Sequence, residues 1–197
     1  MPKPSRYLTV LALAAFALAA APLFAQDTPP PPAAPTAAPA APAGPPDLKA
    51  PYLRNWDDVT GKLVALAEAV PAEKYTWRPA EGVRSVSEVY MHVAGGNFFL
   101  PTALGAELPA GVSREMEKET DKAKVVAALK DSIAHARKAV EGADPATLGQ
   151  EVELFGRKMT RADALLALLS HAHEHLGQAI AYARSNGVAP PWSRAEP

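Results

Sequence analysis

Apolar residues recur at three- and four-residue intervals in four separate stretches of the chain. Such spacing puts apolar side chains on one face of an α-helix, and it predicts helices over about 48–70, 85–100, 121–141 and 160–186. In the third predicted helix, the residues at this spacing are Lys122, Val126, Leu129, Ile133, Ala136 and Val140. Four helices with one apolar seam each predict an all-α fold, namely an antiparallel four-helix bundle.

Local signals mark where the predicted helices begin and end. Ser85 followed by Glu88 has the S-x-x-E spacing of a capping box, and Thr160 is placed to cap the last helix. Asn186-Gly187 is typical of a left-handed helix stop. Residues 151–159 alternate around a glycine, which predicts a small hairpin or a loop before the last helix.

Residues 1–25 have the three parts of a secretory signal peptide. Lys3 and Arg6 give a positive start, an apolar run covers 8–21, and Ala25 precedes the expected cleavage point. The alternative is an uncleaved membrane anchor, but this run falls short of the roughly 20 residues that a spanning helix needs. We therefore expect an exported protein, periplasmic or secreted, with no stable membrane span after cleavage.

A linker and one domain follow the predicted signal peptide. Residues 26–46 are rich in proline and alanine, a composition that cannot bury a core and that favours extended polyproline II backbone. Residues 47–192 are long enough for a single hydrophobic core, and 193–197 form a short tail.

Charge and cysteine content exclude several classes of protein. The formal net charge is −1, and removing Lys3 and Arg6 with the signal peptide makes it −3, which argues against a nucleic-acid partner. The chain contains no cysteine. This excludes a disulfide framework, a thiolate metal site, a cysteine nucleophile and lipid attachment at an exported N-terminus.

Two histidines of the last predicted helix can share a metal ion. At 100° per residue, His171 and His175 lie on one helix face and His173 lies on the opposite one. Imidazoles four residues apart can both reach a cation at about 2.1 Å. The H-x-x-x-H spacing also occurs in helices without a metal, so the pair alone leaves the question open.

His92 is the candidate third ligand. It lies in the middle of the second predicted helix, which a bundle can bring beside the last one. Three neutral imidazoles would leave metal positions open for water and substrate. The alternative is a core histidine bonded to a backbone carbonyl. We expect His135 to be solvated, and His173 to lie at the surface or in an interface.

Gly95 and Gly96 stand inside the second predicted helix, where each costs up to about 1 kcal/mol of helix propensity. Close packing of a neighbouring helix would account for them. Room for a metal-bound ligand above His92 would account for them equally well.

The chain resembles the DinB-like (DinB/YfiT) superfamily of proposed metalloenzymes. The resemblance rests on the motifs Trp77 to Ser85, Met91-His92-Val93-Ala94, His171 to Gln178 and Gly187 to Pro191, in that order. It implies a four-helix bundle in an up-down-down-up arrangement. It also implies a metal held by His92, His171 and His175, often a dimer, and bound zinc, nickel or iron.

These observations predict an exported DinB-like protein that binds a divalent metal through three histidines and acts as a metal-dependent hydrolase or thiol transferase. Zinc is the first choice of metal, with nickel, iron or manganese as alternatives. The partner would be a small molecule of unknown identity, and a homodimer is an open option. The alternatives are a non-catalytic metal- or ligand-binding bundle, and an interaction module whose histidines are structural. No catalytic residue beyond the metal ligands is identifiable.

Overall fold

The computed structural model describes residues 47–193. The predicted signal peptide (1–25) and linker (26–46) lie outside the described residues, as do residues 194–197 of the tail. The helices within 47–193 all lack the combination of length and apolar character that a membrane-spanning segment requires.

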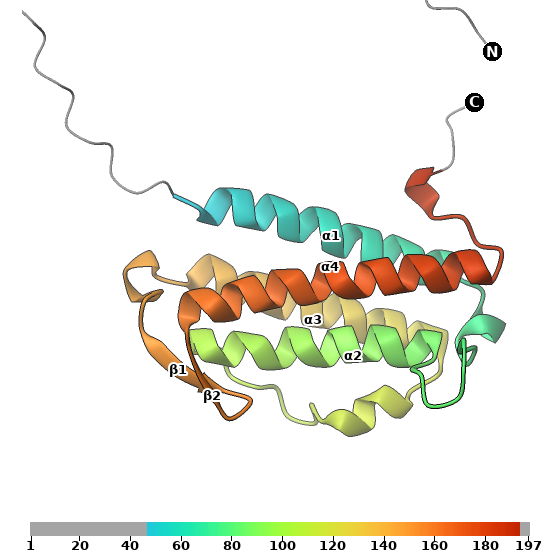
Figure 1. Ribbon diagram of the computed structural model, residues 1–197, viewed down its shortest axis with the longest axis horizontal. Helices are drawn as coiled ribbons and strands as arrows, with labels where there is room; N and C mark the ends of the chain where they lie inside the picture. The colour runs from blue at the N-terminus through green and yellow to red at the C-terminus, as the bar shows by residue number, and fades with distance from the viewer. Residues whose placement is uncertain (1–46, 194–197) are drawn as a thin grey trace, which may run out of the picture. The chain divides into compact units, whose positions relative to one another are not determined.

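Residues 47–193 form four α-helices, as the apolar spacing predicts (Figure 1). They are α1 Lys49–Ala69, α2 Val86–Phe99, α3 Lys122–Gly142 and α4 Arg161–Ser185. Short 3₁₀ turns lie in the connections: η1 Ala72–Lys74, η2 Leu100–Leu104, η3 Arg114–Lys118 and η4 Pro145–Thr147. A fifth, η5 Pro191–Ser193, follows α4.

The predicted caps are present. The Ser85 hydroxyl accepts a hydrogen bond from the backbone N–H of Glu88 at 3.3 Å, and the Glu88 carboxylate accepts one from the Ser85 N–H at 2.6 Å. Thr160 and Asp163 make the same reciprocal pair at the start of α4. Gly187 follows α4 with a φ of 75°, the left-handed conformation expected of a helix stop.

The helix directions differ from an all-antiparallel bundle. Met91 of α2 lines a surface depression together with Ala128 of α3, and further along both helices Asn97 donates a hydrogen bond to Ser132. The contacts thus advance toward the C-terminus of both helices. α2 and α3 therefore run in the same direction, as Figure 1 shows. The long connection over residues 100–121 makes this possible, because it carries the chain back along the bundle before α3 begins. The arrangement is up-down-down-up, as the family resemblance implies, and the antiparallel prediction from the apolar spacing is wrong for this pair.

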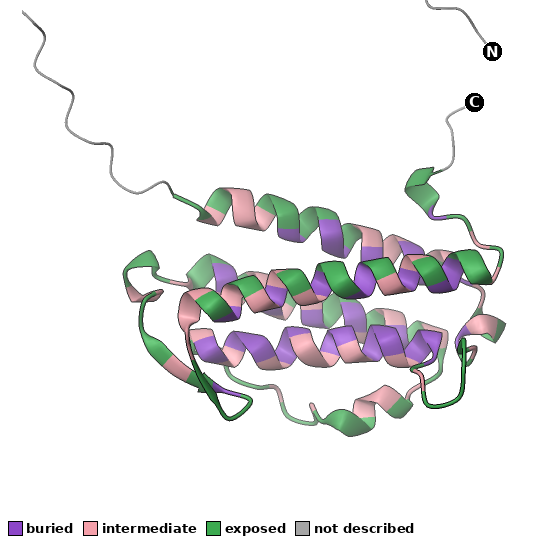
Figure 2. Cartoon of the chain, viewed as in Figure 1, coloured by how far each residue is buried: buried purple, intermediate pink, exposed green. Residues whose placement is uncertain are grey.

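The core lies along α2, which is buried on most of its surface because it packs on both α3 and α4 (Figure 2). In α3 the buried stripe is shifted from the predicted register: Val125 and Ser132 are fully buried, whereas Val126 and Ile133 are only half-buried. The reason is that α3 contacts both α1 and α2, so its buried stripe faces the boundary between those two helices.

The segment before α4 is a hairpin, one of the two alternatives (hairpin or loop) that the sequence predicts. Strands β1 Glu151–Leu154 and β2 Arg157–Thr160 are antiparallel, with Leu154 opposite Arg157. Phe155 and Gly156 make the turn, both with positive φ (54° and 69°). The hairpin lies beside η2 and the start of α4, at the end of the bundle where α2 terminates (Figure 1).

Candidate metal centre

Three histidines from two helices meet between α2 and α4. His92 comes from the middle of α2, and His171 and His175 come from successive turns of α4. Their ring centroids lie 4.5–5.0 Å apart, and one nitrogen from each ring lies within 4.8 Å of the other two. The structure thus brings together the three residues that the sequence analysis selected.

The separation of the His92 and His171 donor atoms fits a single divalent ion. Nε2 of His92 and Nε2 of His171 are 3.2 Å apart. Two nitrogens bound to one ion at about 2.05 Å are separated by roughly 2.9 Å at a right angle and by roughly 3.4 Å at a tetrahedral angle. The observed separation lies between these values, so the two rings need little movement to share a metal.

Glu117 orients His92. Its Oε1 lies 2.9 Å from Nδ1 of His92, and its Oε2 accepts a hydrogen bond from Nε of Arg84 at 3.0 Å. An ionised carboxylate can only accept, so the His92 proton belongs on Nδ1 and the lone pair of Nε2 is directed at the site. A carboxylate behind a ligating histidine is the usual outer support of a metal site.

Gln178 does the same for His175. Nδ1 of His175 lies 2.8 Å from Oε1 of Gln178, whose Nε2 donates to the hydroxyl of Tyr182 at 3.1 Å. The Tyr182 ring is in turn held edge-on against Trp77. This chain of contacts assigns the proton of His175 to Nδ1 and leaves Nε2 as the metal donor.

His171 owes its position to a glycine. A Cβ built on Gly96 would lie 2.4 Å from Cε1 and 2.9 Å from Nδ1 of His171, closer than real side chains approach. Nδ1 of His171 is buried and has no hydrogen-bond partner among the described residues. Close packing therefore explains Gly96, one of the two accounts that the sequence leaves open.

The electrostatics keep the rings of His171 and His92 neutral. Burial, followed by the charges of His175, His92 and Arg84, lowers the pKa of His171 to about 4. Burial also lowers the pKa of His92, although the hydrogen bond with Glu117 opposes it. At neutral pH both rings therefore present lone pairs, the form that binds a metal.

Glu117 is an orienting group and a poor general base. Burial alone would raise its pKa, but the hydrogen bonds from Arg84 and His92 outweigh burial and hold the pKa below its usual value. A carboxylate that stays ionised and doubly hydrogen-bonded has little tendency to take a proton at neutral pH.

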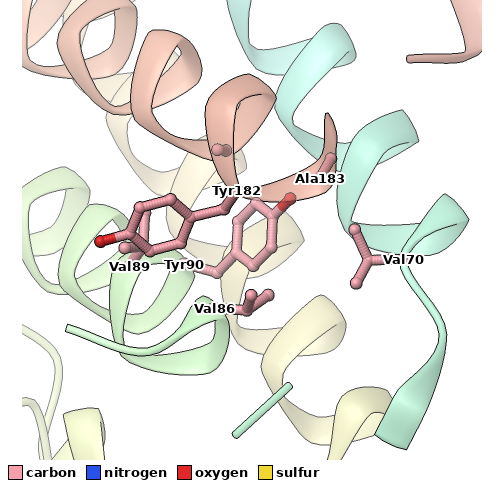
Figure 3. Close-up of a pocket in the computed structure, with 7 residues that line it drawn as sticks. Val70, Val86, Val89, Tyr90, Tyr182 and Ala183 are labelled. Atoms are coloured by element: carbon pink, nitrogen blue, oxygen red, sulfur yellow. The ribbon is translucent and has the colours of Figure 1, made fainter. Parts of the chain in front are cut away.

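The site is closed at one end and partly exposed at His92. The side chain of His92 is 29% exposed, whereas His175 retains 7% of its surface. Further along α2 and α4, the recess lined by Val70, Tyr90 and Tyr182 is filled by its own side chains and has about 0 Å³ for water (Figure 3). A ligand would therefore reach the histidines from the His92 side, away from this closed end.

The other two histidines stand apart from the centre. His173 is exposed, as predicted, and its ring lies by the carbonyl of Leu169. The prediction of a solvated His135 is wrong, because its ring is half-buried against Phe98, with centroids 5.4 Å apart, and its Nε2 is buried.

Sequence reasoning missed Glu117 and Arg84. Both lie outside the α-helices, so helical spacing relates neither of them to His92. Glu115, Glu117 and Glu119 are equivalent in the sequence, and only the path of the α2–α3 connection selects the middle one. No sequence signal could have found it.

A helical bundle with three histidines gathered between two of its helices defines a class of candidate metal-binding proteins. The family model of the DinB superfamily matches residues 55–179. The chain belongs to this superfamily, as the sequence motifs indicate.

Solved structures with the same fold are DinB-like proteins. One from Bacillus cereus ATCC 10987 is 17% identical with a TM-score of 0.63, over 71% of this chain and 93% of that one. Another, from Bacillus subtilis, is 22% identical with a TM-score of 0.56, over 70% of this chain and 92% of that one. At these identities the likeness shows the fold alone. Among curated proteins nothing matches this chain.

Proposed function

We propose that this protein binds one divalent metal ion through Nε2 of His92, His171 and His175 and serves as a metal-dependent hydrolase or thiol transferase. The observation that carries the proposal is the convergence of three donor nitrogens within 4.8 Å, two of them oriented by Glu117 and Gln178. Three protein ligands leave positions open for a further ligand, as in catalytic rather than structural zinc sites.

The residues of the chain hold the ligands and shape the entry, and the metal supplies the chemistry. A bound divalent cation acts as a Lewis acid that lowers the pKa of a water or thiol toward 7. Glu117 and Gln178 hold two imidazoles in the required tautomer, while Gly96 leaves space for the third. Zinc is the first choice of metal, and nickel, iron or manganese are alternatives.

Export is part of the proposal, and it rests on the pattern of residues 1–25 alone. It favours hydrolysis, because cytosolic thiol cofactors are scarcer outside the cell. Expression of the full chain in a bacterial host, followed by mass analysis of the mature N-terminus, tests it. A cleaved product outside the cytoplasm supports export, and an intact chain in the cytoplasm contradicts it.

Metal content is the first test. The full chain, purified without an affinity tag that binds metals, is analysed for bound elements beside His92→Ala, His171→Ala and His173→Ala. We expect about one ion in the wild type and in His173→Ala, the matched control on the same helix, and none in the other two. A wild type that takes up no metal on reconstitution contradicts the proposal.

A second measurement separates catalysis from storage. In the cobalt-substituted protein, a visible spectrum that changes with an apparent pKa near 7 indicates an exchangeable water and supports an enzyme. A spectrum that does not vary with pH indicates a closed coordination sphere and favours the non-catalytic metal-binding alternative.

A further inference from the structure

The hairpin turn beside α2 carries an exposed aromatic ring in a strained conformation. Phe155 is 67% exposed and has a φ of 54°. This left-handed region suits glycine, asparagine or aspartate, and it costs other residues free energy. Asn or Asp followed by glycine is the usual choice for such a turn. Backbone strain of this kind is concentrated at functional sites, so the position calls for a reason.

The strained turn places the Phe155 ring on Phe99, with centroids 5.0 Å apart. Phe99 follows His92 by seven residues, so it lies on the same face of α2, about 10 Å further along the helix axis. The aromatic pair is therefore in line with the histidine cluster.

Between the cluster and the aromatic pair, α2 has no side chains on this face. Gly95 and Gly96 occupy the intervening turn, and both are half-buried. The space beside Gly96 is taken by His171, but among the described residues nothing except the chain neighbours and the nearby backbone of α2 lies within 4 Å of a Cβ placed on Gly95. The second account of the paired glycines, room for a ligand, is therefore compatible with the structure at Gly95.

We propose that Phe155 and Phe99 form an aryl-binding subsite of the metal centre. It takes the aromatic end of a substrate whose polar end binds the metal, about two helical turns back along α2, and whose middle crosses Gly95. This inference rests on the proposed function, and it adds the substrate class: a small molecule with a metal-binding group and an aromatic group at the two ends of a short chain. Stacking of its aromatic group on the exposed Phe155 ring would increase the affinity of such a ligand.

A purely structural role explains less. If Phe155 only covered Phe99, the residue would not be left 67% exposed to water. The Phe155→Asn variant separates the two accounts, because it suits the left-handed turn and removes the ring.

Hydroxamates of increasing length test the subsite on the zinc-loaded full chain. Acetohydroxamate probes the metal alone, benzohydroxamate adds an aryl group too close to reach Phe155, and 5-phenylpentanohydroxamate spans about 10 Å. We expect the longest probe to bind about tenfold tighter than acetohydroxamate, the worth of one aromatic contact. Benzohydroxamate should show little of this gain.

In Phe155→Asn the tenfold gain should disappear, while acetohydroxamate binding and the Tm are maintained. Leu166→Gln is the matched control, because Leu166 is 65% exposed on α4 and should leave the gain intact. Equal affinities for all three probes in the wild type, or a gain that survives in Phe155→Asn, overturn the subsite while the metal centre stands. Failure of the wild type to bind zinc or acetohydroxamate overturns the proposed function and the subsite together.

Discussion

Gly96→Ala should abolish the metal centre without unfolding the protein. The added methyl would lie 2.4 Å from Cε1 of His171, whereas ordinary contacts of a Cβ begin near 3.4 Å. The ring must retreat by about 1 Å, because its neighbour is the rigid backbone of α2. Metal–ligand distances tolerate only about 0.2 Å, so His171 is lost as a ligand. Loss of an outer-shell support alone costs about 10–100-fold in affinity, and we expect at least about 100-fold here.

The fold should survive because two effects of similar size oppose each other. Alanine is favoured over glycine in a helix interior by up to about 1 kcal/mol. Crowding a packed site typically costs about 1–3 kcal/mol. The net loss is thus at most about 3 kcal/mol, less than the stability of a typical domain. A far-UV spectrum and a urea titration of the metal-free protein measure this difference.

Gly95→Ala is the matched control. It makes the same substitution one residue earlier in α2, where an added methyl meets nothing within 4 Å among the described residues except its chain neighbours and the nearby backbone of α2. It should raise the free energy of unfolding by up to about 1 kcal/mol and leave zinc affinity unchanged. Competition with a chromophoric chelator gives both affinities. Wild-type affinity in Gly96→Ala, or equal losses in the two variants, would refute the packing argument.

Three further substitutions test the supports of the site and of α2. Glu117→Gln should weaken zinc binding about 10–100-fold in the same chelator assay, since the charge behind His92 is lost; unchanged affinity would show that Glu117 does not support the metal. Gln178→Leu should lower affinity in a similar range through His175, and a chelator titration that matches wild type would argue against this contact. Glu88→Gln should make the free energy of unfolding depend less on pH in the acid range. The backbone N–H of Ser85 and the Arg78 guanidinium hold the pKa of Glu88 below its usual value. In the wild type, ionised Glu88 therefore adds stability above about pH 4.5, and this stability is lost as pH falls through the pKa of Glu88 in the folded state. Urea midpoints measured from pH 3 to 6 test this. A variant whose midpoints change with pH as steeply as those of the wild type would contradict it.

Sequence patterns alone predicted the helices and their ends, because the forces involved act over a few residues. The Ser85 and Thr160 caps formed as expected, since each hydroxyl has its partner three residues along. The His171 and His175 pair was predictable for a related reason: helix geometry alone puts residues four apart on one face. His92 needed the family motifs, since its distance from His171 is 79 residues of chain.

Tertiary packing decided the rest, because it depends on which surfaces meet. The parallel run of α2 and α3 follows from a long connection whose path has no periodic signal. That path brings Glu117 to His92, and the two neighbours of α3 shift its buried stripe to Val125.

Gly95 and Gly96 show most clearly which features the local sequence predicts and which the tertiary structure decides. Their sequence indicated that something required small residues there, but only the fold assigned Gly96 to the ring of His171 and Gly95 to open space. Local chemistry thus determined the helices and the His171 and His175 pair of this DinB superfamily protein. The supports of the ligands, and the space beside them, came from contacts between segments far apart in the chain.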